Sequence, residues 1–153
     1  MKIQYCSDLH LDYNNISSKR GFNRFLRPEA EVLVLAGDVA ETVSEEIYMK
    51  FIEYCSSNFK HTILVSGNHE YYDSSIKLGE RFLNSINEIY PNVYYLNKGK
   101  IKIEHITFLG TILWSFIPKK NASSVKRSYN DTTLIKNFNI ERWNRKYIEN
   151  LQW

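Results

Sequence analysis

The chain has 153 residues, of which 43% are hydrophobic and 24% charged, and its formal net charge is +3. This composition is typical of a globular domain with its own core, and it argues against intrinsic disorder. No stretch approaches the roughly 20 apolar residues that a membrane helix needs, so no membrane partner is expected.

Three short apolar runs predict buried β-strands. They span residues 3–6, 32–36 and 63–66. The second run is apolar at every position, which is typical of a strand covered on both faces of a parallel sheet. A parallel sheet is therefore the predicted centre of the fold.

Amphipathic helical patterns lie between and after these strands. Residues 42–45 match a capping box and open an apolar stripe that ends near Phe59. A second stripe covers residues 76–89 and closes before Pro91, and a weaker helical candidate covers residues 21–26. The alternation of strands and helices predicts parallel strands joined by right-handed crossovers.

The pattern changes after residue 92. Short strands joined by tight turns are predicted at residues 93–96, 100–103 and 106–109. Residues 111–116 could form a further strand, residues 118–131 have no periodicity and predict a loop, and Asn139 caps a helical stripe that runs to the last residue. The predicted fold class is α/β: parallel strands with crossover helices, then a short antiparallel β region and a C-terminal helix, in a single domain over residues 1–153.

A polar cluster directly follows each of the three predicted parallel strands. The clusters contain Asp8 and His10, then Asp38, then Asn68 and His69. Because the carboxyl ends of parallel strands lie at one edge of a sheet, we expect these side chains to converge there.

The residue types in these clusters suit a pair of divalent metal ions. A carboxylate such as Asp38 can bridge two cations, and Asn68 adds a neutral oxygen ligand. Mixed nitrogen and oxygen ligands without thiolate favour Mn, Fe, Zn or Ni. Two such ions about 3.5–4 Å apart could hold a hydroxide and bind phosphate oxygens for in-line attack.

The motifs Asp8-x-His10, Gly37-Asp38 and Gly67-Asn68-His69-Glu70 resemble the first three motifs of the calcineurin-like metallophosphoesterase family. Their order, their spacing and the strand before each agree over most of the chain. The resemblance implies a partial metallophosphoesterase-type α/β sandwich, two divalent metal ions and a phosphoester substrate. It also implies roles for individual residues.

By this resemblance, Asp8 and His10 would hold the first metal and Asp38 would bridge the two ions. Asn68 would hold the second metal and contact the phosphate. His69 would be the catalytic residue that contacts the substrate, either protonating the leaving-group oxygen or stabilising the transition state.

The family completes its site with later histidine motifs, which this sequence lacks. Besides His10 and His69, the chain has only His61, which precedes its strand, and His105, in a predicted hairpin turn. Neither is expected to be a ligand, so each metal would lack at least one histidine and occupancy would be partial. The chain resembles a C-terminally truncated domain, whose exposed sheet edge and apolar face would favour a homo-oligomer or a complementing chain.

Three readings of function stay open. The first is metal-dependent hydrolysis of phosphate mono- or diesters, and the alternative is a truncated, non-catalytic remnant that binds a metal or a partner. The third reading, with the weakest support, is a nucleic-acid binder, and nucleic acid is also an open substrate class. Residues 98–153 carry 11 Lys and Arg against 4 acidic residues, although a solvated basic surface is the more common explanation. Two cysteines, Cys6 and Cys55, suit buried free thiols and a cytoplasmic location.

Overall fold

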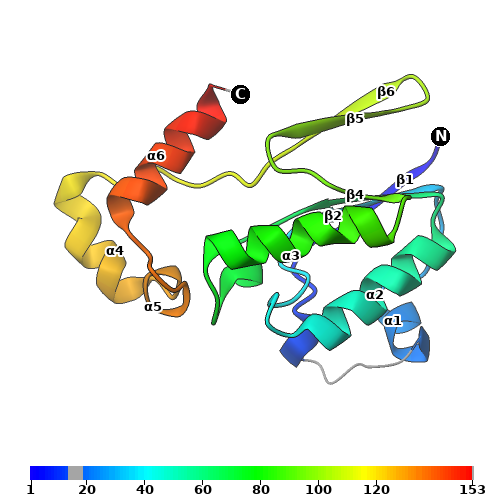
Figure 1. The fold of residues 1–153 in the computed structure, drawn as a ribbon, viewed down its shortest axis with the longest axis horizontal. Coiled ribbons are helices and arrows are strands. Elements are labelled where there is room, and N and C mark those ends of the chain that lie inside the picture. Colours follow the sequence, from blue (N-terminus) through cyan, green and yellow to red (C-terminus); the bar gives the residue numbers. More distant parts are fainter. Residues whose placement is uncertain (14–18, 153) are drawn as a thin grey trace.

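The computed structural model describes residues 1–13 and 19–152, which form a layered α/β arrangement (Figure 1). A four-stranded parallel sheet has the order β1-β2-β3-β4, with helices α1, α2 and α3 on one side and the β5–β6 hairpin on the other. The predicted fold class is confirmed. The strands are β1 (Ile3–Cys6), β2 (Val32–Ala36), β3 (His61–Val65), β4 (Val93–Tyr95), β5 (Gly99–Ile103) and β6 (Ile106–Gly110). The α-helices are α1 (Lys19–Phe25), α2 (Glu45–Asn58), α3 (Ile76–Ile89), α4 (Ala122–Ser128), α5 (Asp131–Leu134) and α6 (Ile140–Leu151). Short 3-10 turns are η1 (Leu11–Tyr13), η2 (His69–Tyr71) and η3 (Lys119–Asn121).

The register of the parallel sheet aligns the ends of its strands. Cys6 lies opposite Leu35, and Ala36 lies opposite Val65. The segments that follow β1, β2 and β3 therefore leave the sheet at the same edge. This alignment places the three polar clusters of the sequence next to one another.

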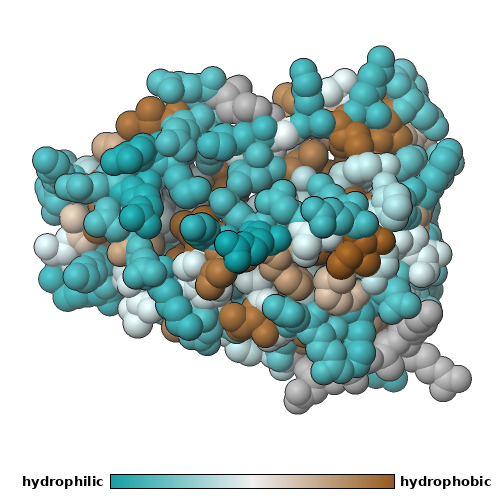
Figure 2. All heavy atoms as spheres, viewed as in Figure 1, coloured by the Kyte–Doolittle hydropathy of each residue, from teal (hydrophilic) through white to brown (hydrophobic). Residues whose placement is uncertain are grey.

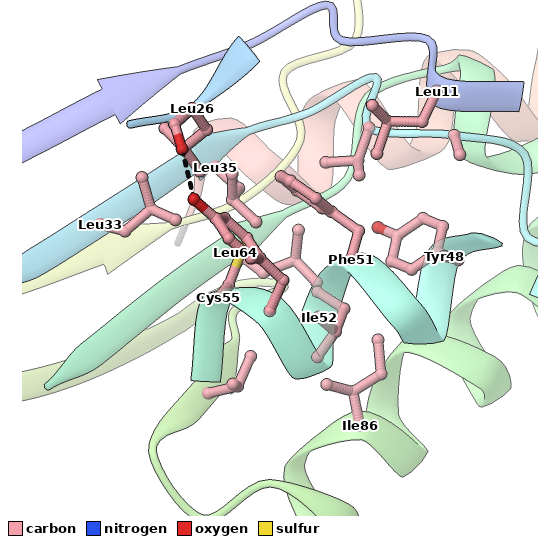
Figure 3. Packing of buried hydrophobic residues seen from close by; sticks show 14 of the residues in the cluster. Leu11, Leu26, Leu33, Leu35, Tyr48, Phe51, Ile52, Cys55, Leu64 and Ile86 are labelled. Atoms are coloured by element: carbon pink, nitrogen blue, oxygen red, sulfur yellow. Dashed lines mark hydrogen bonds between the residues drawn. The ribbon is translucent and has the colours of Figure 1, made fainter. Parts of the chain in front are cut away.

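The main core lies between the sheet and the helices. Figure 3 shows side chains of the sheet meeting those of α2 and α3; among them are Leu33, Leu35, Leu64, Phe51, Ile52, Cys55 and Ile86. Burying an aliphatic or aromatic side chain of this kind contributes roughly 1.5–3 kcal/mol. A smaller cluster on the opposite face joins Val32 and Ile63 to Ile103 of the hairpin. Both faces of the sheet are thus packed against other elements.

A third cluster belongs to the C-terminal part of the chain. Trp114, Ile117, Ile135 and Trp143 pack against Tyr71, which follows β3. Asn139 caps α6 as predicted, because its side chain accepts a hydrogen bond from the Arg142 N–H at 3.0 Å. This packing brings the basic C-terminal segment against the polar edge of the sheet.

Three details of the sequence-based prediction were wrong. Ser44, not Thr42, is the residue before α2, and the Thr42 hydroxyl instead donates to the Glu70 carbonyl oxygen at 2.7 Å. Residues 118–131 contain η3 and α4 rather than a plain loop, and residues 111–116 form no strand. The tertiary contact of Thr42 replaces its local capping role.

The surface agrees with an open sheet edge. Strand β1 has a neighbour on one side only in the described sheet, and Tyr5 on it is 80% exposed. Figure 2 shows that apolar residues on the viewed face form separate small patches among hydrophilic ones. An oligomer or partner at this edge remains a prediction.

Among residues 1–13 and 19–152, no helix combines the length and apolar character needed to cross a membrane.

Candidate metal centre

Asp8, His10 and Asp38 meet at the carboxyl edge of the sheet. Their carboxylate and imidazole ligand atoms all lie within 4.8 Å of one another. All three have a positive φ, at 56°, 43° and 55°. Non-glycine residues rarely adopt this conformation, and such strain is concentrated at functional sites. The unusual backbone conformation of these residues therefore coincides with the convergence of three potential ligands.

Backbone hydrogen bonds hold these strained residues in place. The Asp8 N–H donates to the Gly37 carbonyl oxygen at 3.1 Å, and the His10 N–H donates to the Asp38 carbonyl oxygen at 3.1 Å. These bonds continue the pairing of β1 with β2 beyond the regular strands. They fix the distance between the two ligand-bearing loops.

Asp38 also contacts the loop after β3. Its Oδ1 atom accepts a hydrogen bond from the His69 N–H at 2.9 Å. Gly67 packs so closely that a Cβ atom there would lie 2.2 Å from the same oxygen. Gly37 has a φ of +92°, and a Cβ atom on it would lie 2.7 Å from the Gly67 nitrogen. Both glycines of the sequence motifs are thus required by close backbone approach.

The Glu70 side chain links the loop after β2 to the loop after β3. Its carboxylate accepts hydrogen bonds from the N–H groups of Asp38, Val39 and Gly67, at 3.0, 2.8 and 2.7 Å. Burial raises the pKa of this carboxyl group to about 7, while the backbone hydrogen bonds oppose the rise. The sequence motif contains Glu70, and the structure gives it a supporting role.

Replacing Glu70 with glutamine should destabilise the fold by about 1–3 kcal/mol, because one backbone donor would lose its acceptor. The difference in free energy of unfolding between the wild type and Glu70→Gln should also depend on pH. In the absence of metal, the wild type should lose stability relative to the variant as the pH rises from 4.5 through about 7. The sign follows from the raised pKa: the folded state binds the proton more tightly than the unfolded chain, so protonation stabilises the fold. Urea unfolding across this pH range measures both effects.

The exposed Glu88 on α3 offers the matched control, because Glu88→Gln changes the same group without touching a loop. It should leave both the free energy of unfolding and its pH dependence near those of the wild type. If the free energy of unfolding changed with pH equally in the wild type and in Glu70→Gln, the raised pKa of Glu70 would be contradicted.

His69 is buried, with 2% of its surface exposed, and its Nε2 atom lies 2.8 Å from the Asp12 Oδ2 atom. Asp12, Glu41 and His69 form a second group whose ligand-type atoms lie within 4.8 Å of one another. The rings of His69 and His10 lie edge to face, with centroids 4.4 Å apart. The second group therefore adjoins the first. Sequence reasoning missed Asp12 and Glu41, although Asp12 stands two residues after His10.

Asn68 presents its amide nitrogen to two partners. Its Nδ2 atom donates to Asp131 Oδ1 at 2.7 Å and to the Tyr72 hydroxyl oxygen at 2.8 Å. Asp131 is the first residue of α5 and lies 63 positions away in the chain. Sequence reasoning placed Asp131 in a loop and gave it no role.

The two remaining histidines lie away from both groups. His61 is the first residue of β3, at the end of the strand opposite Gly67, and its Nδ1 atom lies 3.3 Å from the Tyr94 hydroxyl oxygen. His105 is exposed in the turn between β5 and β6. Both histidines thus lie away from the two ligand groups, and their exclusion as metal ligands stays a prediction.

A groove of about 980 Å³ begins beside Asn68 and runs under the C-terminal segment. Its walls combine aromatic, amide and hydroxyl groups, among them Tyr72, Trp114, Asn121, Asp131, Phe138 and Trp143. Gly67 and Asn68 line the groove as well, so the groove borders the loop after β3 that contacts Asp38. Its size suits an organic group larger than a phosphate ion.

The donor set fits divalent metal ions. Asp8 and Asp38 bring two carboxylates together, and no lysine or arginine of residues 1–13 and 21–152 forms an ion pair with either. Two like charges at this distance repel unless a cation lies between them. Imidazole and carboxylate together suit Mn, Fe, Zn or Ni.

Known proteins share both the sequence pattern and the fold. Residues 1–148 match the sequence profile of the calcineurin-like phosphoesterase family. An uncharacterized protein of Acanthamoeba polyphaga mimivirus is 31% identical over 145 residues, which covers 88% of this chain and 51% of the relative. The chain therefore spans about half the length of the curated relative it matches.

The crystal structure of a phosphopantetheinyl hydrolase from Mycobacterium tuberculosis superposes with a TM-score of 0.66 at 17% sequence identity. The match covers 98% of this chain and 61% of that chain, and it shows a shared fold. The family resemblance drawn from the three motifs is thus confirmed by the profile match. This chain belongs to the calcineurin-like phosphoesterase family.

Proposed function

We propose that this chain hydrolyses phosphate mono- or diesters at a dinuclear centre of divalent metal ions. The observation that carries the proposal is the convergence of Asp8, His10 and Asp38 within 4.8 Å at the edge of the sheet. When bound, the metal ions would supply an activated hydroxide and neutralise charge on the phosphate. Asp8 and His10 would hold one ion, and Asp38 would bridge.

Asn68 and His69 provide the substrate side of the site. The Asn68 side chain would give an oxygen to the second ion and contact the phosphate. His69 would transfer a proton to the leaving-group oxygen, and Asp12, 2.8 Å from its Nε2 atom, would fix the orientation of the ring. The buried position of His69 excludes bulk water from this pair.

The groove beside Asn68 supports an organic phosphoester as the substrate. Its aromatic and amide walls could hold an uncharged leaving group while the phosphate lies at the metal centre. The organic phosphoester substrate, the divalent metal ions and a partner chain that completes the ligand set are all parts of this proposal.

Hydrolysis of p-nitrophenyl phosphate or its bis-ester with added Mn²⁺ tests the proposal. His69→Ala should lower kcat by roughly a hundredfold or more, because a positioned proton donor contributes about that much. His105→Ala is the matched control, since His105 lies exposed in the hairpin turn, and it should retain full activity. Absence of turnover with every divalent metal would overturn the hydrolase assignment for this chain.

A metal-binding module without turnover is the second candidate. It is favoured by the histidine count, because His61 and His105 lie away from the two ligand groups and the chain has four histidines in all. Stoichiometric binding of Mn²⁺ without hydrolysis of either ester would support this candidate over the enzyme.

A further inference from the structure

The Asn68 amide is held from one side by a closed triangle of hydrogen bonds. Its Nδ2 atom donates to Asp131 Oδ1 at 2.7 Å and to the Tyr72 hydroxyl oxygen at 2.8 Å. The Tyr72 hydroxyl in turn donates to the same Asp131 oxygen at 2.7 Å. Each of the three side chains thus contacts the other two.

The chemistry of this triangle permits one orientation of the amide. An ionised carboxylate accepts hydrogen bonds and cannot donate them, so the nitrogen of Asn68 must face Asp131. The Tyr72 hydroxyl is a phenol, which carries a proton at neutral pH and donates it to the Asp131 oxygen. The Asn68 oxygen is directed away from both partners.

The backbone delivers Asp131 to this position. The Asp73 N–H donates to the Leu134 carbonyl oxygen at 3.0 Å, and the Lys136 N–H donates to the Ser74 carbonyl oxygen at 2.7 Å. These bonds tie the C-terminal end of the short helix α5, and the residues just after it, to the segment that follows η2. Ile135, 2% exposed, anchors the same segment in the C-terminal cluster. Asp131 is thus fixed beside Asn68 by structure outside the three sequence motifs.

We propose that Asp131 is a positioning residue of the metal centre, which holds the Asn68 amide nitrogen so that the amide oxygen is presented to a divalent metal ion. The proposal rests on the proposed role of Asn68 as a metal ligand. Tyr72 supports this arrangement, because its hydroxyl donates to the same Asp131 oxygen and accepts the second N–H of the Asn68 amide. The C-terminal segment therefore contributes to the metal site through Asp131.

The isosteric variant Asp131→Asn tests this role. An asparagine at position 131 can donate as well as accept, so it would allow the Asn68 amide to turn over and present nitrogen instead of oxygen. The dissociation constant for Mn²⁺ should then rise roughly 10- to 100-fold, the usual effect of removing a group that orients a ligand. Tyr72→Phe leaves the carboxylate in place and should give a smaller rise.

A double-mutant cycle separates positioning from a general structural effect. Mn²⁺ binding is measured by calorimetry for the wild type, Asp131→Asn, Asn68→Ala and the double variant. If Asp131 acts through Asn68, Asp131→Asn should have little further effect once Asn68 is alanine. Glu141→Gln, which removes an exposed carboxylate from α6, should bind Mn²⁺ like the wild type.

Thermal unfolding without metal checks that each variant is folded, and Tyr72→Phe provides a second variant should Asp131→Asn fail to fold. Unchanged Mn²⁺ affinity in Asp131→Asn would overturn the positioning role while leaving the proposed function intact. An equal loss in the presence and absence of Asn68 would overturn it too, because Asp131 would then act independently. Failure of the wild type to bind Mn²⁺ would overturn both the proposed function and this role.

Discussion

Replacing Asp38 with asparagine should raise the dissociation constant for Mn²⁺ by at least about 100-fold and abolish ester hydrolysis. Even groups that only orient metal ligands change affinity by roughly 10- to 100-fold, and Asp38 is a predicted bridging ligand. The fold should persist, because the asparagine oxygen can still accept the hydrogen bond that the His69 N–H donates to Oδ1. Calorimetry with Mn²⁺ and unfolding in urea measure the two properties separately.

Glu104→Gln is the control for this change. Glu104 is exposed in the turn between β5 and β6, so the variant removes one negative charge far from the ligand groups. It should bind Mn²⁺ with the affinity of the wild type. Tight Mn²⁺ binding by Asp38→Asn would show that the metal lies elsewhere.

Gly67→Ala should damage the site while adding only one methyl group. The new Cβ atom would lie 2.2 Å from Asp38 Oδ1 and 2.9 Å from the Asp38 nitrogen, so the side chain or the loop must move. We expect a loss of about 1–3 kcal/mol in stability from the overlap, and a loss of Mn²⁺ affinity comparable with that of Asp38→Asn. Unfolding and metal titration on the same preparation measure both.

Gly99→Ala is matched to this change, because the nearest atom to a Cβ at residue 99 is a Leu96 side-chain carbon at an ordinary 3.4 Å. Gly99→Ala should leave metal binding unchanged. If Gly67→Ala bound Mn²⁺ as well as Gly99→Ala, the close approach of the two loops would have no role in the metal centre.

The parts of the site that sequence reasoning found lie at the ends of buried parallel strands. Such strands are apolar at nearly every position, so β2 could be recognised without an alignment. The shared edge of a parallel sheet then placed Asp38 near Asp8 and His69. The alignment of β1, β2 and β3 supports that inference.

The parts that were missed depend on contacts that sequence periodicity does not record. Helix α4 has no buried residue, so it shows no apolar stripe and resembles a loop. Asp131 reaches Asn68 across 63 residues, and Thr42 bonds to Glu70 across 28. Asp12 is close to His10 in sequence, but its role depends on His69, which is 57 residues away. In each case a tertiary partner, not the local pattern, decides the role.

Titration of the purified metal-free chain with Mn²⁺, read by calorimetry and by electron paramagnetic resonance, tests the central claim most directly. A dinuclear centre predicts up to two bound ions per chain and a spin-coupled signal once both are present, with both features lost in Asp38→Asn. A chain that binds no Mn²⁺, or binds it equally well after Asp38→Asn, would contradict a metal centre built on Asp8, His10 and Asp38.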